Sequence, residues 1–130
     1  MEPRNLAALF ELGAVIYPDK EIDATDRPWY SLPGSNGVFL KDLVTGKETG
    51  GKFSYHLVRI EKDCEVPDHD HETQWEWNMI LRGKGTFLLG DKEVAIQPGQ
   101  SFATPPKNHH TVSAGNEELS LLAVFVPALA

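Results

Sequence analysis

The stretch GTFLLGDKEVAI, residues 85–96, decides the fold class of this chain. Two β-rich runs flank Gly90-Asp91, and a Gly-Asp pair in that position is typical of a tight β-hairpin. Working outward, similar short runs recur from Val38 onward, separated by turn residues such as Pro98-Gly99. The predicted strands are 38–44, 52–60, 75–81, 85–89, 92–96, 101–104, 111–113 and 119–126. This pattern indicates an all-β antiparallel sandwich or barrel and by itself leaves the way the sheet closes open.

The composition indicates one ordinary globular domain. The chain has 130 residues, of which 41% are hydrophobic and 24% charged, and this length supports a single hydrophobic core. The formal net charge of −7 repels phosphate groups, so we expect neither nucleic acid nor a membrane surface as a partner. The single cysteine, Cys64, excludes an intrachain disulfide and any site built from several thiolates.

The apolar segments do not match a secretory signal or a membrane-spanning helix. Glu11 interrupts the first apolar segment, and the start of the chain carries an acid and a proline. The longest apolar run, residues 119–130, contains Ser120 and Pro127 and is too short to span a bilayer. We therefore expect a cytoplasmic protein.

Residues 1–37 are predicted to form an irregular or short-helical lead-in. Residues 5–16 partly match one face of a short helix, and Pro18, Pro28 and Pro33 interrupt regular structure after it. The lead-in either wraps the domain or packs on a partner subunit.

Two histidines, His69 and His71, stand two residues apart in the stretch PDHDH, residues 67–71. In an extended chain, residues at this spacing project from the same face, so both imidazoles can bind one metal ion. Glu76 follows after a polar, turn-like segment, and a chain reversal there would direct it to the same interior. A carboxylate beside imidazoles suits iron, manganese, nickel or zinc. The competing interpretation is a solvated acidic loop, because Asp68 and Asp70 alternate with the two histidines.

A second block of residues completes a resemblance to a known family. The first block has the spacing His-x-His, four residues, Glu, six residues, Gly; the second has Gly, five residues, Pro, four residues, His. Over residues 38–126 these blocks resemble the two motifs of the cupin superfamily, G-x5-H-x-H-x3–4-E-x6-G and G-x5-P-x-G-x2-H-x3-N. Three positions depart from the motifs: Asp63 and Lys107 replace glycines, and Ala114 replaces the final asparagine.

The resemblance implies a double-stranded β-helix, or jelly-roll barrel, over residues 38–130. It also implies one divalent transition-metal ion, Fe, Mn, Ni or Zn, held by His69, His71, Glu76 and His110. The motif spacing selects His110 rather than His109 as the last ligand, and adjacent strand residues point to opposite faces. His56 has no support from the motifs and is interpreted as an ordinary strand histidine.

Strand parity predicts which side chains face the pocket. Trp75 and Trp77 flank Glu76 and should point to the outer face, toward solvent or a subunit interface. The predicted substrate pocket consists of Tyr55, Asn78, Ile80, Phe102 and Val112.

Similar sites in cupins imply an enzyme acting on a small molecule, with an iron-dependent dioxygenase as the first hypothesis. A metal-dependent isomerase or lyase and a non-catalytic binding or sensing barrel are the alternatives, and a metal-free structural barrel is a third interpretation. The family resemblance further implies a homodimer that pairs through an outer sheet face. No residue is assigned a catalytic role from the sequence.

Overall fold

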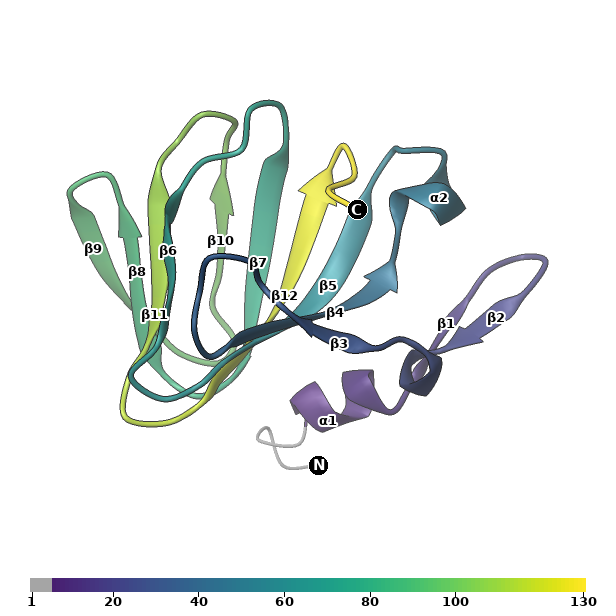
Figure 1. Cartoon of the computed structure of the whole chain (residues 1–130), viewed down its shortest axis with the longest axis horizontal. Coiled ribbons are helices and arrows are strands. Elements are labelled where there is room, and N and C mark those ends of the chain that lie inside the picture. Colours follow the sequence, from purple (N-terminus) through teal and green to yellow (C-terminus); the bar gives the residue numbers. More distant parts are fainter. Residues whose placement is uncertain (1–5) are drawn as a thin grey trace.

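The computed structural model describes residues 6–130 of the chain. Its N-terminal part forms helix α1 (Leu6–Glu11), a hairpin of β1 (Ala14–Ile16) and β2 (Glu21–Asp23), and a 3₁₀ turn (Ala24–Asp26). Figure 1 shows α1 and the hairpin outside the barrel, below and to the right of the larger sheet. The predicted helix began at position 5, which lies outside the described residues. The observed helix ends at Glu11 because Gly13 and the β-branched residues Val15 and Ile16 favour the hairpin that follows.

Two antiparallel sheets form the barrel (Figure 1). The larger has the strand order β10-β7-β12-β5-β4-β3 and the smaller the order β6-β11-β8-β9. Their bounds are β3 Trp29–Ser31, β4 Val38–Val44, β5 Ser54–Ile60, β6 Glu65–His69, β7 Trp75–Arg82, β8 Gly85–Leu89, β9 Lys92–Ile96, β10 Ser101–Thr104, β11 His110–Ala114 and β12 Leu119–Val126. A one-turn helix α2 (Gly46–Thr49) joins β4 to β5. The predicted all-β jelly-roll fold is confirmed.

Two strands of the barrel were not among the predicted runs. β6 contains the polar residues Glu65, Asp68 and His69 and has Pro67 in its middle, so its identity as a strand comes from pairing with β11. β3 lies within the predicted lead-in yet pairs with β4 through Tyr30 and Leu40 as an edge strand. Part of residues 1–37 therefore belongs to the larger sheet and does not lie apart from it.

No helix in the described part of the chain is long and apolar enough to cross a membrane.

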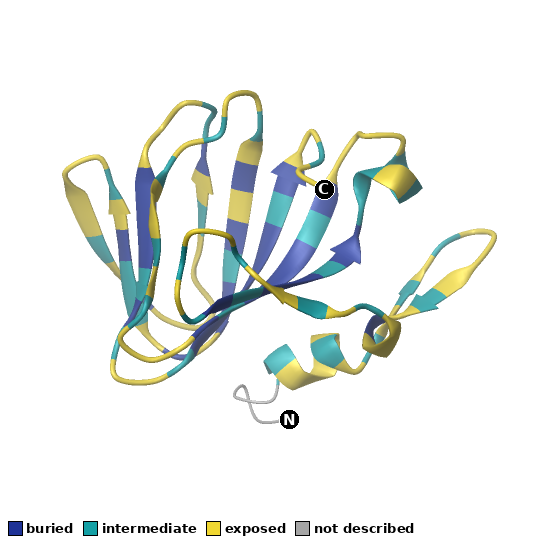
Figure 2. Ribbon diagram, viewed as in Figure 1, coloured by how far each residue is buried: buried dark blue, intermediate teal, exposed yellow. Residues whose placement is uncertain are grey.

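The core follows the period-two alternation of the strands, and Figure 2 shows buried residues alternating with less buried ones along several strands of the two sheets. On β12, Leu121, Ala123 and Phe125 face the barrel interior, whereas Leu122 joins a second cluster beneath α1 and the 3₁₀ turn. The interior of the barrel is therefore apolar except where specific polar side chains enter it.

Two of the departures from the family motifs adopt the backbone that glycine favours. Asp63 has φ 60° and Lys107 has φ 67°, and within residues 6–130 they alone among the non-glycine residues have a positive φ. Each costs on the order of 1 kcal/mol relative to glycine. The Lys107 N–H donates to the carbonyl oxygen of His71 at 2.7 Å, so this loop supports the segment that follows β6.

Candidate metal centre

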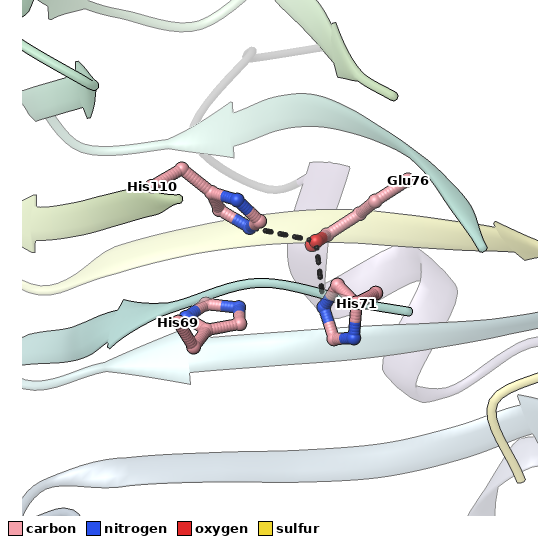
Figure 3. Close-up of side chains that lie close together, drawn as sticks. All are labelled: His69, His71, Glu76 and His110. Atoms are coloured by element: carbon pink, nitrogen blue, oxygen red, sulfur yellow. Dashed lines mark hydrogen bonds and ion pairs between the residues drawn. The ribbon is translucent and has the colours of Figure 1, made fainter. Parts of the chain in front are cut away.

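Three strands bring four polar side chains to one place inside the barrel (Figure 3). His69 ends β6 and is paired in register with His110, the first residue of β11. His71 follows β6 directly, and Glu76 is the second residue of β7. The chain reverses between His71 and Glu76, so the odd sequence offset does not separate their side chains.

One ligand atom from each of His69, His71, Glu76 and His110 lies within 4.8 Å of the others. Glu76 Oε1 is 2.9 Å from His110 Nε2 and 3.2 Å from His71 Nε2. Three imidazoles and one carboxylate are a donor set that suits Fe, Mn, Ni or Zn. The side chains expected to hold a metal ion therefore place their ligand atoms close together.

Backbone carbonyls fix the orientation of two of the rings. His69 Nδ1 lies 2.7 Å from the carbonyl oxygen of Pro67, and His110 Nδ1 lies 2.9 Å from that of Asn108. A carbonyl oxygen can only accept, so each Nδ1 carries the hydrogen and the opposite nitrogen is the one available to an ion. This is the arrangement in which metal-binding histidines are commonly held.

The buried polar atoms of the cluster are not all satisfied by protein. His71 Nε2 is buried and, among the described residues, has no hydrogen-bond partner. Asn78 Nδ2 donates to Glu76 Oε2 at 3.1 Å, which occupies that oxygen and leaves Oε1 facing the histidines. Since a buried polar atom without a partner is unfavourable, these residues fit a cation bound between them.

The electrostatics of the cluster also favour a cation. Burial alone would raise the pKa of Glu76, but the hydrogen bond with His110, the nearby His71 ring and the hydrogen bond from Asn78 outweigh it and hold the pKa well below the usual value. Burial opposes protonation of His110, yet the Glu76 carboxylate and the Asn108 carbonyl raise its pKa. Burial lowers the pKa of His69, which keeps this ring neutral. The site therefore holds an ionised carboxylate beside a neutral His69 ring and a His110 ring whose protonation that carboxylate favours.

His109 lies outside the cluster. Its ring is exposed and faces Asp68 and Asp70, with Nδ1 3.3 Å from Asp68 Oδ2 and Nε2 3.9 Å from Asp70 Oδ2. Neighbouring strand residues point to opposite faces, so His110 enters the barrel and His109 leaves it. The same alternation exposes Trp75 (53%) and Trp77 (48%) on either side of buried Glu76, as the sequence predicted.

A cavity of about 400 Å³ adjoins the cluster. Its walls include His69, His71 and Glu76 at one end and mostly aliphatic residues elsewhere. Two of the predicted pocket residues, Asn78 and Val112, line this cavity.

The other three predicted pocket residues lie elsewhere. Ile80 is buried within the apolar core and does not line the cavity. Phe102 stacks on Phe87, with ring centroids 3.9 Å apart, and borders a separate hollow between β8, β9 and β10. Tyr55 lies beneath α1, because on β5 it is Ser54, His56 and Val58 that face the barrel interior. The expectation that these three wall the substrate cavity is corrected accordingly.

Sequence reasoning missed a second polar group on the inner face of the larger sheet. His56 Nδ1 lies 2.7 Å from Asp42 Oδ1 and Nε2 lies 2.9 Å from Ser54 Oγ, while Tyr30 Oη donates to Asp42 at 2.6 Å. The cavity residues Asp70, Phe125 and Leu129 were also missed. The parity of β5 places Ser54 and His56 on one face, but the cross-strand partner Asp42 follows only from the register of β4 and β5.

Comparisons with known proteins agree with this geometry. The family described as "Cupin domain" matches residues 56–125. An oxalate-binding protein of Thermotoga maritima is 31% identical over 70 residues, which are 53% of this chain and 58% of that protein. The chain thus spans less than two thirds of the length of this curated relative.

Solved structures share the fold. A crystal structure from Thermotoga maritima, described as a predicted oxalate decarboxylase, has a TM-score of 0.70 and 27% identity, covering 78% of this chain and 91% of that one. Bacillus subtilis oxalate decarboxylase, described with Mn(II) centres, has a TM-score of 0.70 and 19% identity, covering 82% of this chain and 29% of that one. At 19% identity the second likeness concerns the fold alone.

Proposed function

Since the chain belongs to the cupin domain family, we propose that it is a metal-dependent enzyme acting on a small organic molecule, with an iron-dependent dioxygenase as the most specific form of the proposal. His69, His71, Glu76 and His110 hold one divalent transition-metal ion in this proposal. The ion supplies a Lewis-acidic position at which dioxygen and a chelating substrate can meet.

One observation carries the proposal: three ring nitrogens and one carboxylate oxygen converge beside a largely apolar cavity. Four protein ligands leave one position free on a five-coordinate ion and two on a six-coordinate ion. A cavity that adjoins these positions admits a small molecule, so that a substrate is oriented beside the ion and its apolar part is buried.

The residues around the cavity favour oxygen chemistry over isomerisation or elimination. Those reactions need a side chain that takes or gives a proton within hydrogen-bond reach of the substrate. Among the described residues that line the cavity, the polar ones outside the four proposed ligands are Asp70, which is exposed, and Asn78, which is bonded to Glu76. A dioxygenase needs fewer proton-transferring side chains than an isomerase or a lyase, because dioxygen and the metal ion supply its chemistry.

The decisive test measures metal and dioxygen together. Protein purified without chelators should contain about one metal ion per chain, and iron-loaded protein should consume dioxygen in step with a chelating substrate such as a catechol or a β-diketone. The His110→Ala variant should lose both properties, whereas His109→Ala, changed at the neighbouring outward position, should retain both. Protein that takes up no metal on titration would refute the proposal.

A binding protein without turnover is the second candidate. The name of the Thermotoga relative, an oxalate-binding protein, and the scarcity of proton-transfer groups in the cavity favour it. Loaded protein that binds the same ligands but neither consumes dioxygen nor changes them would support this candidate. Conversion of a ligand without dioxygen consumption would support an isomerase or lyase.

A homodimer is part of the proposal. Trp75, Trp77 and Val126 are exposed, and Val126 pairs with Trp75 across β12 and β7, so they form one apolar patch on the outer face. Apolar aromatic side chains of this kind are enriched where subunits meet. Analytical ultracentrifugation should show a dimer that Trp77→Glu dissociates, with Trp29→Glu on another part of the molecule as the control.

A further inference from the structure

We propose that the site takes a monoanionic ligand that chelates the ion through two oxygens and carries an apolar body, in preference to a dicarboxylate. This inference rests on the proposed metal centre and names the class of molecule that would bind there. Three features of the cavity carry it: its lining, its charge and its length.

The lining is aliphatic away from the metal cluster. The larger sheet contributes Val38, Leu40 and Val58, and β11 contributes Val112. Leu129, 40% exposed, lines the cavity from the C-terminal segment. Burying an apolar body against such walls contributes about 25 cal/mol per Å² of surface removed from water. A ligand with only polar atoms gains nothing from most of this surface.

The charge of the site accommodates a single negative charge on the ligand. A divalent ion held by the Glu76 carboxylate and three neutral imidazoles keeps one net positive charge. Of the residues 6–130 that the structure describes, those lining the cavity include no lysine or arginine, while Asp70 adds a further carboxylate. A dianion would therefore leave one negative charge without a partner in apolar surroundings, which is strongly unfavourable.

The cavity is long enough for the chelating group and the apolar body of a ligand to occupy different parts of it. Glu76 and Asn78 lie on β7, and the aliphatic residues Leu40 and Val38 lie on β4, three strands away in the order β7-β12-β5-β4. At a strand spacing of about 4.8 Å, the apolar floor extends roughly 14 Å from the strand that carries the carboxylate. The volume of about 400 Å³ lies within the range of cavities that hold ligands much larger than a two-carbon acid.

Three 2-oxo acids with the same chelating head test the proposal. Pyruvate, 2-oxopentanoate and 2-oxoglutarate should be titrated calorimetrically into anaerobic, iron(II)-loaded protein whose iron content has been measured first. The five-carbon 2-oxopentanoate should bind about tenfold more tightly than pyruvate, because it has two more methylenes to bury. It should bind at least tenfold more tightly than 2-oxoglutarate, which differs from it by the distal carboxylate alone.

A charge placed in the wall provides the matched comparison. Leu129→Lys should reduce the preference for 2-oxopentanoate over 2-oxoglutarate at least tenfold, because the new ammonium can pair with the distal carboxylate. Leu12→Lys, at an exposed leucine that does not line the cavity, should leave the preference unchanged.

The outcomes separate this inference from the proposal on which it rests. Absence of bound iron or another metal refutes the metal centre itself. Metal-loaded protein that prefers 2-oxoglutarate, that fails to bind 2-oxopentanoate, or whose preference is unchanged by Leu129→Lys would overturn the ligand class and leave the metal centre standing.

Discussion

Two groups of buried histidines share the interior of this barrel, and they differ in how their ring nitrogens are satisfied. At His56, which is 0% exposed, one nitrogen lies against Asp42 and the other against Ser54. At His71 the buried Nε2 has no hydrogen-bond partner among the described residues. Phe125 packs edge-on against both rings, with centroid distances of 5.6 Å to His56 and 5.0 Å to His71.

This difference separates a structural histidine from a candidate ligand. A ring with both nitrogens bonded to protein has no free lone pair to offer, and its role is to hold strands together. Rings whose outer nitrogens are anchored to carbonyls, and whose inner nitrogens converge on one carboxylate, leave their remaining bonding capacity to an ion. Burial and the presence of a nearby carboxylate are common to both groups, so neither feature alone identifies the metal centre.

The largest effect should come from removing the only anionic donor of the metal centre. Glu76→Gln should lower the affinity for Zn²⁺ or Fe²⁺ by more than about 100-fold. Loss of a residue that only hydrogen-bonds to a ligand typically lowers metal affinity by about 10- to 100-fold, and loss of a ligand should exceed this. Competition with a chromophoric chelator measures this change. Glu72→Gln, at an exposed neighbouring carboxylate, is the control and should bind metal normally.

The comparison predicts unequal losses of stability when a histidine of each group is removed. In metal-free protein, His56→Ala should lower the free energy of unfolding by about 3 kcal/mol, because it opens a cavity and takes one hydrogen-bond partner from each of Asp42 and Ser54. His71→Ala should cost about 1 kcal/mol, since it loses the packing of the ring against Phe125 but breaks no hydrogen bond at Nε2. Urea unfolding with a chelator present measures both, and equal losses would contradict the distinction drawn above.

The pH dependence of stability should reverse when metal is added. The raised pKa of His110 means that its pairing with Glu76 stabilises metal-free protein fully below the ordinary histidine pKa, and that this stabilisation is lost as pH rises through the raised pKa. The lowered pKa of Glu76 keeps that carboxylate ionised throughout this range. Metal must displace the proton, so its stabilising effect grows as pH rises.

Thermal unfolding between pH 6 and pH 9 tests this reversal. The chelator-treated protein should become less stable toward pH 9 and the metal-saturated protein more stable, while His109→Gln changes neither slope. Parallel slopes in the two states would show that His110 does not exchange a proton for the ion.

The smallest effect concerns the loop of Lys107, whose N–H donates to the carbonyl oxygen of His71 in the candidate metal centre. Lys107→Gly should raise the free energy of unfolding by about 0.5 kcal/mol, because glycine adopts the left-handed backbone of this position without a steric cost. Asn108→Gly, at a neighbouring residue without a positive φ, should lower it. Both changes are measured by denaturant unfolding, and equal shifts in the two variants would contradict the explanation.

Most of the barrel strands could be predicted from local pattern, because alternating burial and turn residues are properties of short segments. The runs 38–44, 85–89, 92–96, 101–104 and 119–126 agree with the observed strands at both ends. β6 and β3 could not be found in this way, since polar β6 and short β3 depend on pairing with β11 and β4. Tyr55 lies on the outer face of β5, and Phe102 faces the interior but packs on Phe87 away from the cavity, so neither position could be read from one segment alone.

The sequence by itself determined the fold class, the residue types of the metal centre and the inward direction of Glu76 and His110. The fold class follows from the period-two alternation of strand side chains, whereas the four residues and the inward direction of Glu76 follow from the resemblance to the two cupin motifs. Only the tertiary structure decided that the Pro67 and Asn108 carbonyls orient two of the rings, that His71 keeps an unpartnered nitrogen, and that His56 is satisfied by Asp42 and Ser54. Hydrogen bonds between strands depend on register and ring orientation, which arise when the sheets pack and leave no signature in one segment alone.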